Sequence, residues 1–372
     1  MAEIPPDTLL TPSTHHLAET SCKMNVPTLA ELLEKWYGTS DSEAVAEQHE
    51  EDRCMLYPSM DNMVSMDKFP YYRAGCTDLP TVAEIEQAFR DRAAGLRSYP
   101  TQSDVHVCRL GKYVAKKCKS AMNIFIEANN LLFLEDYEVR TPKLFAAWAV
   151  GPEYYNDGYL VMEYIEGQQF TGQLLSELEP AAIKIIGRKF AEQIRLLRSI
   201  PNEGDEFYST LNRKGFPPWN YFLSTHKSIV NGPYNSYKAL IDAFCDTLEL
   251  STVMNTVMAS AVMGASKGTK ATFTHLDLKF ENMIVRPIKS EDGATIEDWE
   301  VTLIDWHECA WLPEWTQFVA IQEKFARGWL YEEYEQHTNL LWDYFLEHFE
   351  ETFPQEREFM HKCNKAGLSF LF

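Results

Sequence analysis

The chain has 372 residues, with 34 Lys and Arg against 55 Asp and Glu, and it is 45% hydrophobic and 24% charged. This composition is that of an ordinary globular protein with two or three packing units, which excludes a wholly disordered chain. The formal net charge of −21 argues against nonspecific binding to nucleic acid or to anionic lipid.

Membrane and export signals are absent from the sequence pattern. No stretch approaches the roughly 20 apolar residues that a transmembrane helix needs. The segment from Met1 to Pro12 carries Glu3 and Asp7 and no basic region, unlike a signal peptide. We therefore expect a cytoplasmic protein with no membrane partner, whose eight cysteines form no Cys-x-x-Cys pair and are reduced: Cys22, Cys54, Cys76, Cys108, Cys118, Cys245, Cys309 and Cys363.

The first elements along the chain lie in an extension, residues 1–78, which we expect to pack on the main body. Its apolar spacing predicts a helix over residues 28–37. A sharper helix start follows, where Thr81 and Glu84 have the spacing of a capping box ahead of apolar residues at helical intervals. The first lobe is therefore predicted to begin at residue 79.

The small lobe, residues 79–165, has the pattern of an antiparallel sheet with a helix. Two segments with alternating polarity, 105–110 and 113–117, flank Gly111 and Lys112. Glycine at the first central position of a two-residue turn favours a type II′ hairpin. The next elements are predicted to be a helix and a strand, at 121–135 and 158–164.

The larger lobe, residues 166–372, is dominated by helical spacing. One β interruption is predicted, because residues 283–286 and 300–304 have the pattern of two strands joined by a polar loop over 287–298. The order of elements therefore predicts an α+β, bilobal fold. Its small lobe has an antiparallel sheet and a helix, and its larger lobe is mostly helical with an inserted β-hairpin.

Three oxygen-bearing side chains are brought together by that hairpin. Asn282 directly precedes its first strand and Asp305 directly follows its second, so antiparallel pairing places both at the same end. Asp277 lies in the loop that leads into that end. Carboxylate and amide oxygens suit Mg²⁺, and a second carboxylate can accept a proton from an attacking hydroxyl. Phosphoryl transfer requires this division of labour, with Asp277 as the base and the other two as metal ligands.

A lysine and a glutamate in the small lobe indicate the same chemistry. Glu127 lies on or beside the apolar stripe of the predicted helix, where a carboxylate is costly without a cation. Lys116 alternates with Val114 on one face of the preceding strand and is the expected partner, whereas Lys117 points to the opposite face. A strand lysine held by a helix glutamate presents an ammonium to nucleotide phosphates. A surface position for Glu127 at the edge of the stripe remains the alternative.

These motifs resemble the aminoglycoside phosphotransferase and choline kinase-like family, within the protein kinase-like fold. The resemblance spans residues 80–340 and is closest to fungal small-molecule phosphotransferase-like proteins. Its specific part is the pair FTHLDLKFENMIV, residues 273–285, and LIDWHECAWLPEW, residues 303–315. Weaker motifs follow the order of the family: VAKKC at 114–118, TPKLFAAW at 141–148, YLVMEYIEG at 159–167 and NGPY at 231–234.

The resemblance implies a phosphotransferase that uses ATP and Mg²⁺ to phosphorylate a hydroxyl of a small molecule. ATP would lie between the lobes, where the backbone of the connector Glu163, Tyr164 and Ile165 would meet the adenine. His275 would brace the catalytic loop. The remaining implied roles are phosphate contact for Lys116, support of that lysine for Glu127, general base for Asp277, and Mg²⁺ ligation for Asn282 and Asp305.

Other functions were weighed against this one. A catalytically silent or non-phosphorylating kinase-like binding protein is the main alternative, because the segment from Gly95 to Val105 has no glycine-rich pattern. A protein kinase is disfavoured, because no Ala-Pro-Glu anchor follows Asp305. Two further alternatives are disfavoured. One is a metallohydrolase centre formed by His275, Asp277, Asp305 and His307. The other is a thiol nucleophile at Cys118 or Cys309.

The acceptor is expected to be a small hydroxylated molecule that carries an amine. Glu308 and Glu314 closely follow Asp305 and lie among aromatic residues such as Trp311 and Trp315. Carboxylates beside aromatic faces suit an ammonium group, through charge pairing and cation–π attraction. The alternative is that these carboxylates are solvated and that the aromatic residues belong to the core.

Overall fold

The computed structural model describes eight stretches of the chain: residues 28–44, 64–91, 105–150, 157–202, 207–216, 232–248, 261–325 and 334–365. The chain divides into two compact units, Met1–Asp52 and Arg53–Phe372. In the first unit the predicted helix is present as α1 (Leu29–Tyr37). It begins at a capping box formed by Thr28 and Glu31 and ends at Gly38, whose φ of 72° is left-handed.

The second unit contains a small lobe built on a five-stranded antiparallel sheet, in the order β1-β4-β5-β3-β2. The predicted hairpin is present, and Gly111 at its turn has a φ of +63°. β1 belongs to the predicted extension and pairs Tyr71 with Ala147 of β4. The strands are β1 (Tyr71–Tyr72), β2 (Val105–Leu110), β3 (Tyr113–Cys118), β4 (Leu144–Ala149) and β5 (Gly158–Glu163).

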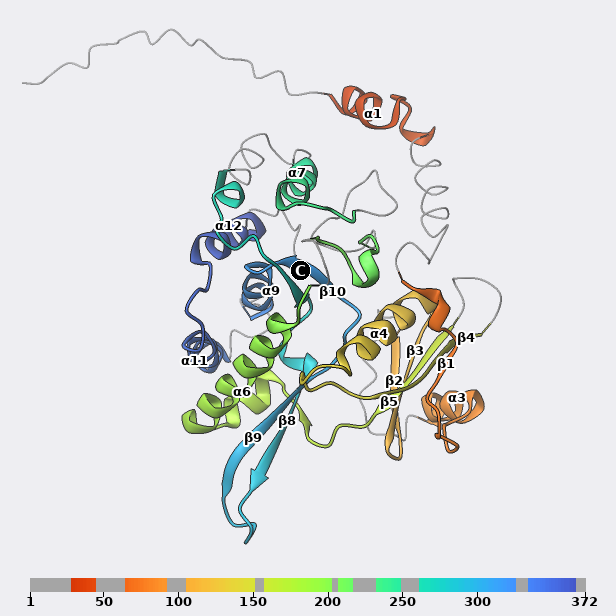
Figure 1. Cartoon of the computed structure of the whole chain (residues 1–372), viewed down its shortest axis with the longest axis vertical. Coiled ribbons are helices and arrows are strands. Elements are labelled where there is room, and N and C mark those ends of the chain that lie inside the picture. The colour runs from red at the N-terminus through yellow and green to blue at the C-terminus, as the bar shows by residue number, and fades with distance from the viewer. Residues whose placement is uncertain are drawn as a thin grey trace, which may run out of the picture. The chain divides into compact units, whose positions relative to one another are not determined.

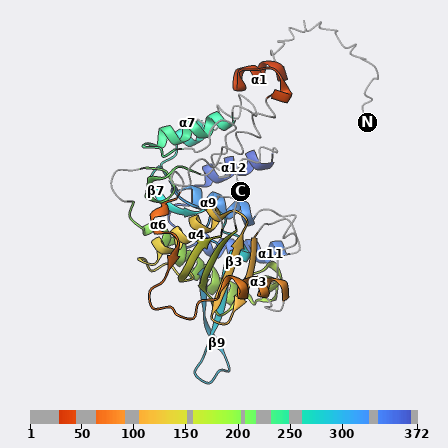
Figure 2. The same cartoon turned by 90° about the vertical axis from the view of Figure 1, so that its right-hand side faces the viewer.

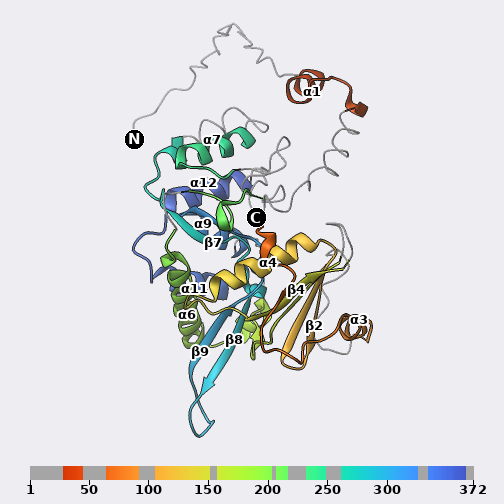
Figure 3. The same cartoon turned by 45° about the vertical axis from the view of Figure 1, so that its right-hand side comes forward.

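Two helices cover opposite faces of this sheet (Figure 3). α3 (Val82–Asp91) begins at the predicted capping box, where the Glu84 amide donates to the Thr81 hydroxyl and Glu84 accepts from the Thr81 amide. It packs Ile85 on one face, together with Ala115 of β3. α4 (Ala121–Leu134) packs on the other face, together with Val114. The predicted alternation along β3 is therefore confirmed.

The larger lobe is mostly helical and carries two small sheets. Its helices are α5 (Gly172–Glu177), α6 (Pro180–Ser199), α7 (Tyr237–Leu248), α9 (Thr316–Phe325), α11 (Glu335–Leu346) and α12 (Pro354–Lys365). One sheet has the order β6-β8-β9 and the other pairs β10 with β7. Their strands are β6 (Gln168–Gln169), β7 (Ala271–His275), β8 (Met283–Lys289), β9 (Ile296–Leu303) and β10 (Cys309–Pro313).

The β8–β9 hairpin is longer than predicted and projects from the lobe (Figures 1 and 2). The predicted loop over 287–298 was wrong, because the ladder continues through Pro287, opposite Trp299, to Lys289, opposite Ile296. Pro287 is tolerated there because β6 pairs only with Ile284 and Val285, which leaves Pro287 on an open edge. Trp299 is buried, which favours continued pairing.

The β7–β10 sheet was missed by the sequence analysis. All five residues of each strand are buried. β10 is apolar throughout and has no alternation, and β7 alternates apolar and polar residues only from Ala271 to Thr274, which is a short signal for a strand. The predicted α+β fold is nevertheless confirmed, with a small lobe of sheet and helices and a larger, mostly helical lobe with an inserted hairpin. Within the described stretches, no helix has the length and apolar character needed to cross a membrane.

Candidate active site

His275, the last residue of β7, anchors the loop that carries Asp277. The Gln317 side chain, on α9, bonds the backbone of His275 twice, accepting from its N–H and donating to its carbonyl, both at 2.9 Å. The His275 ring accepts from the Asp277 N–H through Nδ1 at 3.2 Å, so Nε2 carries the proton and donates to the Ile304 carbonyl at 3.1 Å. Burial lowers the pKa of His275 to about 4, which keeps the ring neutral.

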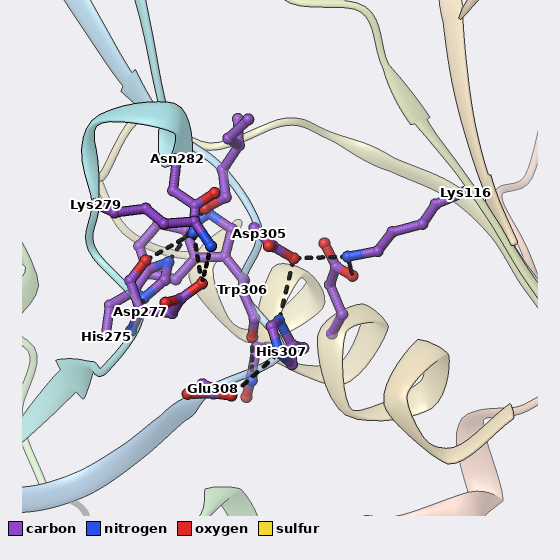
Figure 4. Close-up of polar contacts among 12 residues, drawn as sticks. Lys116, His275, Asp277, Lys279, Asn282, Asp305, Trp306, His307 and Glu308 are labelled. Atoms are coloured by element: carbon purple, nitrogen blue, oxygen red, sulfur yellow. Dashed lines mark hydrogen bonds and ion pairs between the residues drawn. The ribbon is translucent and has the colours of Figure 1, made fainter. Parts of the chain in front are cut away.

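Both carboxylate oxygens of Asp277 are engaged, and Figure 4 shows the contacts of one of them with Lys279 and Asn282. Oδ1 lies 2.5 Å from Nζ of Lys324, on α9. Oδ2 accepts from Nζ of Lys279 at 3.0 Å and from Nδ2 of Asn282 at 2.9 Å. Burial opposes ionisation of Asp277, but the ammonium groups of Lys324 and Lys279 outweigh burial and lower the pKa. Asp277 is therefore held as a carboxylate.

Asn282 and Asp305 lie at the same end of the β8–β9 hairpin, as predicted. Met283 pairs with Leu303, and the Ile304 amide donates to the Asn282 carbonyl at 3.0 Å. The side-chain amide of Asn282 donates through Nδ2 to both the carbonyl and the carboxylate of Asp277. The Oδ1 atom of Asn282 is therefore directed away from the loop that carries Asp277. Asp305 has a left-handed φ of 66°, a conformation that Asp tolerates better than most residues.

Lys116 contacts one carboxylate from each lobe, and its contact with Asp305 joins the two. Its Nζ lies 2.6 Å from Oε2 of Glu127 and 2.6 Å from Oδ1 of Asp305. Glu127 is 1% exposed, so the alternative that placed it on the surface was wrong. Burial opposes the charge on Lys116, but Asp305 and Glu127 raise its pKa above the usual range. Lys117 points to the opposite face, as predicted, and pairs with Glu86 at 2.7 Å.

His307 connects Asp305 to Glu308. Its Nδ1 donates to Asp305 at 3.1 Å and its Nε2 lies 3.4 Å from the carboxylate of Glu308. Burial opposes protonation, but the neighbouring Asp305 raises the pKa of His307 well above its usual value. The larger lobe is also tied to α4 here, because Asn130 donates to the carbonyl of Trp306 at 2.6 Å.

The donor set at the hairpin end fits Mg²⁺. The Asp305 carboxylate is ionised, because burial is outweighed by Lys116 and His307, which lower its pKa well below the usual range. An amide oxygen from Asn282 and a carboxylate from Asp305 are hard ligands, and Mg²⁺ binds proteins through one or two such groups together with substrate phosphates. Within the described stretches, no three His, Cys, Asp or Glu side chains gather as in an all-protein metal centre.

Two disfavoured alternatives lose their geometric basis here. Both ring nitrogens of His275 bond the backbone, so a metallohydrolase centre has no free nitrogen at this residue. Burial raises the pKa of the Cys118 and Cys309 thiols, which opposes formation of a nucleophilic thiolate. Cys76, Cys108, Cys118 and Cys309 are free thiols, as expected for these four.

The connector between the lobes is the segment that follows β5. The Tyr164 amide donates to the Lys112 carbonyl at 3.0 Å, and the Arg109 guanidinium lies 3.6 Å from the centre of the Tyr164 ring. The Glu163 N–H is also occupied, because it donates to the Lys143 carbonyl at 2.9 Å. The N–H groups of both residues are thus bonded within the small lobe. The loop predicted to cover the nucleotide, between Gly95 and Val105, lies outside the described residues.

The carboxylates expected at the acceptor site have other partners. Glu308 faces His307, and Glu314 lies 3.3 Å from the Arg198 guanidinium. Trp311 and Trp315 are buried in the core. Two contacts from α9, those of Gln317 and Lys324, were not predicted. Half of the residues of α9 are polar, so neither residue stood out in the sequence.

A model of the phosphotransferase enzyme family matches residues 100–329, more than half of the chain. No curated protein matches the chain. Among solved structures, the chain is similar to the aminoglycoside phosphotransferase APH(2″)-IIa in its streptomycin and ATP complex, at 16% identity and a TM-score of 0.45, covering 78% of this chain and 90% of that one.

A second similar structure is the aminoglycoside phosphotransferase APH(3″)-Id from Streptomyces rimosus. The identity is 13% and the TM-score 0.42, with 76% of this chain and 97% of that one covered. A third is a putative aminoglycoside phosphotransferase from Ralstonia eutropha, at 14% identity and a TM-score of 0.39, covering 76% of this chain and 97% of that one. On the match to the family model, the chain belongs to the phosphotransferase enzyme family.

Proposed function

We propose that the protein is a kinase of small molecules, which transfers the γ-phosphate of ATP to a hydroxyl group in the presence of Mg²⁺. The observation that carries the proposal is the convergence at one place of Asp277, Asn282 and Asp305 from the larger lobe with Lys116 from the smaller one. Phosphoryl transfer relies on positioning and electrostatic stabilisation, and these four groups supply both.

The reaction assigns a role to each group. The acceptor hydroxyl gives its proton to Asp277, its oxygen forms a bond to the γ-phosphorus, and the bond from that phosphorus to the bridging oxygen breaks to release ADP. Lys116 would contact the phosphates, and Glu127 would hold its ammonium in place. Mg²⁺, when bound through Asn282 and Asp305, would neutralise charge on the phosphates.

The kinase-like binding protein without transfer activity remains the second candidate. It is favoured by the direct contact between Lys116 and Asp305, because each of these groups neutralises the other in the absence of nucleotide. A thermal-shift titration with Mg-ATP addresses this candidate. Stabilisation by Mg-ATP without transfer to any hydroxyl compound would support a binding role.

Three finer expectations remain predictions. An amine on the acceptor is supported only by Glu308 and Glu314, which pair with His307 and Arg198. A cytoplasmic location and a fungal relationship rest on sequence alone. The nucleotide contacts of Glu163, Tyr164 and Ile165 rest on the family resemblance.

The experiment is a mass-shift screen for a gain of phosphate across hydroxylated small molecules with Mg-ATP. Asp277→Asn is the matched control, because it keeps the shape and the bonds to Asn282 but removes the proton acceptor. We expect this variant to bind Mg-ATP normally and to lose transfer by about 10²-fold or more. Near-normal turnover by Asp277→Asn would show that another group is the base.

A further inference from the structure

The two oxygens of Asp277 differ in their remaining capacity for hydrogen bonds. Oδ2 receives two donors, from Lys279 and Asn282, whereas Oδ1 has one ion-pair contact, with Lys324. A carboxylate oxygen accepts about two hydrogen bonds. The position open to an acceptor hydroxyl is therefore on Oδ1, beside the ammonium of Lys324.

Sharing one oxygen places the acceptor close to Lys324. Nζ of Lys324 lies 2.5 Å from Oδ1, so a hydroxyl on the same oxygen would be its immediate neighbour. Groups one or two bonds from that hydroxyl would then meet the ammonium. The chemistry of Lys324 consequently selects what the acceptor carries next to its reactive oxygen.

Among the residues that the structure describes, Lys324 is a buried ammonium with a single ion-pair contact. Its side chain is 10% exposed, and in the part of the chain that the structure describes its ion-pair partner is Asp277. An ammonium has three N–H donors, and a buried charge is costly unless it is paired and hydrogen-bonded. An oxygen-rich group on the acceptor would supply the missing contacts.

The local charge favours an anion over a cation. Lys279 and Lys324 both contact the carboxylate of Asp277, so a group bound next to Oδ1 meets ammonium groups at close range. An ammonium on the acceptor would be repelled from both lysines at close range, whereas a carboxylate would be attracted.

We propose that the phosphate acceptor carries a carboxylate close to its reactive hydroxyl and that Lys324 binds this carboxylate. The inference rests on the proposed function, because it takes Asp277 as the group that meets the hydroxyl. It opposes the sequence-based prediction of an amine. Lys324 is thereby a residue that determines acceptor specificity.

The test measures binding without phosphate transfer. Calorimetric titrations of the Mg-ADP-saturated protein use two sets of probes that share hydroxyl groups and differ in charge. One set is glycerate, glycerol and 3-aminopropane-1,2-diol, and the other is glucuronate, glucose and glucosamine. We expect at least one carboxylate to bind ten or more times more tightly than its neutral counterpart, and the amines to bind most weakly.

Variants assign the preference to Lys324. Lys324→Met should remove the preference for the carboxylate, and Lys324→Arg should keep most of it by keeping the charge. Lys238→Met is the control, because Lys238 is an exposed lysine of α7 that pairs with Asp242. Thermal unfolding of each variant with Mg-ADP checks that the protein is folded, and Lys324→Gln, which also removes the charge, replaces Lys324→Met if that variant unfolds.

Three outcomes would overturn the inference. The first is that an amine binds most tightly, and the second is that the anionic, neutral and cationic probes bind equally or not at all. The third is a preference for the carboxylate that survives Lys324→Met. A tenfold loss of Mg-ATP affinity in Lys324→Met with the preference intact would instead assign Lys324 to the transferred phosphate. Carboxylate binding that depends on Lys324, in a protein that never transfers phosphate, would contradict the proposed function alone.

Discussion

The two ion-paired groups at the candidate site have opposite balances of charge. Around Asp305, two cations, Lys116 and His307, face three carboxylates, those of Glu127, Asp305 and Glu308. Asp277, by contrast, forms ion pairs with two ammonium groups, those of Lys279 and Lys324. The first group has an excess of negative charge and suits a metal cation, whereas the second suits an anion.

This difference indicates how one site can serve two ligands. The two groups lie next to each other, and Asn282 connects them. Its side chain donates to Asp277, and its carbonyl accepts from the amide of Ile304, which directly precedes Asp305. Charged ligands of opposite sign would therefore be directed to different positions in the same site. Breaking one group should change the binding of its own ligand and leave the other largely unaffected.

Among changes in ligand binding and stability, the largest effect is expected from Asp305→Ala. This change removes a carboxylate from the negative group, while Lys116 keeps Glu127 as its partner. We expect ATP affinity measured with Mg²⁺ to fall about tenfold or more, and affinity measured without Mg²⁺ to change much less. Calorimetric titration with ATP, in Mg²⁺ and in EDTA, measures both values.

The matched control for Asp305→Ala is Asp292→Ala. Asp292 lies in the exposed turn of the β8–β9 hairpin, where it accepts from Ser290 and Ala294. The Asp292→Ala variant should bind ATP like the wild type, both in Mg²⁺ and in EDTA. Equal losses for Asp305→Ala with and without Mg²⁺ would argue against metal ligation by this residue.

A smaller effect is expected within the negative group, between Lys116 and Glu127. Removing Lys116 leaves the buried charge of Glu127 uncompensated, and removing Glu127 leaves Lys116 with Asp305 as its ion-pair partner, so the double substitution should cost less than the two single ones together. We expect a coupling of about 1–3 kcal/mol in the free energy of unfolding for Lys116→Met and Glu127→Gln. Urea unfolding of the two single variants and the double variant gives this value.

The control pair for this cycle lies on the opposite face of β3. Lys117 and Glu86 are 2.7 Å apart and more exposed, so their coupling should be about 1 kcal/mol or less. Strict additivity for Lys116 and Glu127 would show that their contact contributes nothing to stability. The comparison of the two pairs isolates the effect of burial on adjacent residues of one strand.

The two groups also differ in how far the sequence predicted them. Strand alternation placed Lys116 and Lys117 on opposite faces, and the apolar stripe of α4 indicated a buried Glu127. Antiparallel pairing placed Asn282 beside the segment that leads to Asp305. These are local patterns with fixed periods, so they carry over directly into the fold.

The contacts of α9 could not be predicted in this way. Lys324 is 47 positions from Asp277, and the two meet only because α9 packs behind β7. That packing depends on the β7–β10 sheet, which was missed because β10 is apolar throughout and the alternation of β7 spans only four residues. Contacts set by tertiary packing have no period in the sequence, which is why the positive group was not foreseen.

The smallest effect concerns His275, which supports both groups through Asp277 and Ile304. Its pKa is lowered to about 4, so the unfolded chain binds the proton more tightly than the folded one. The contribution of neutral His275 to the free energy of unfolding is therefore fully present above pH 6.5 and is lost as the pH falls toward 4. Protonation would also direct a second N–H at the Asp277 amide.

Between pH 7.0 and 5.5 we expect His275 to cost the folded state about 1 kcal/mol. The wild-type slope alone does not isolate this residue, because His307, with a raised pKa, contributes with the opposite sign. The measurement is therefore urea unfolding of the wild type and of His275→Gln at both pH values. The variant should be less stable at pH 7.0, and its deficit should shrink by about 1 kcal/mol at pH 5.5. A deficit that stays constant or grows would mean that the His275 ring accepts a proton in the folded protein as readily as in the unfolded chain, against the burial and the backbone hydrogen bonds that hold it neutral.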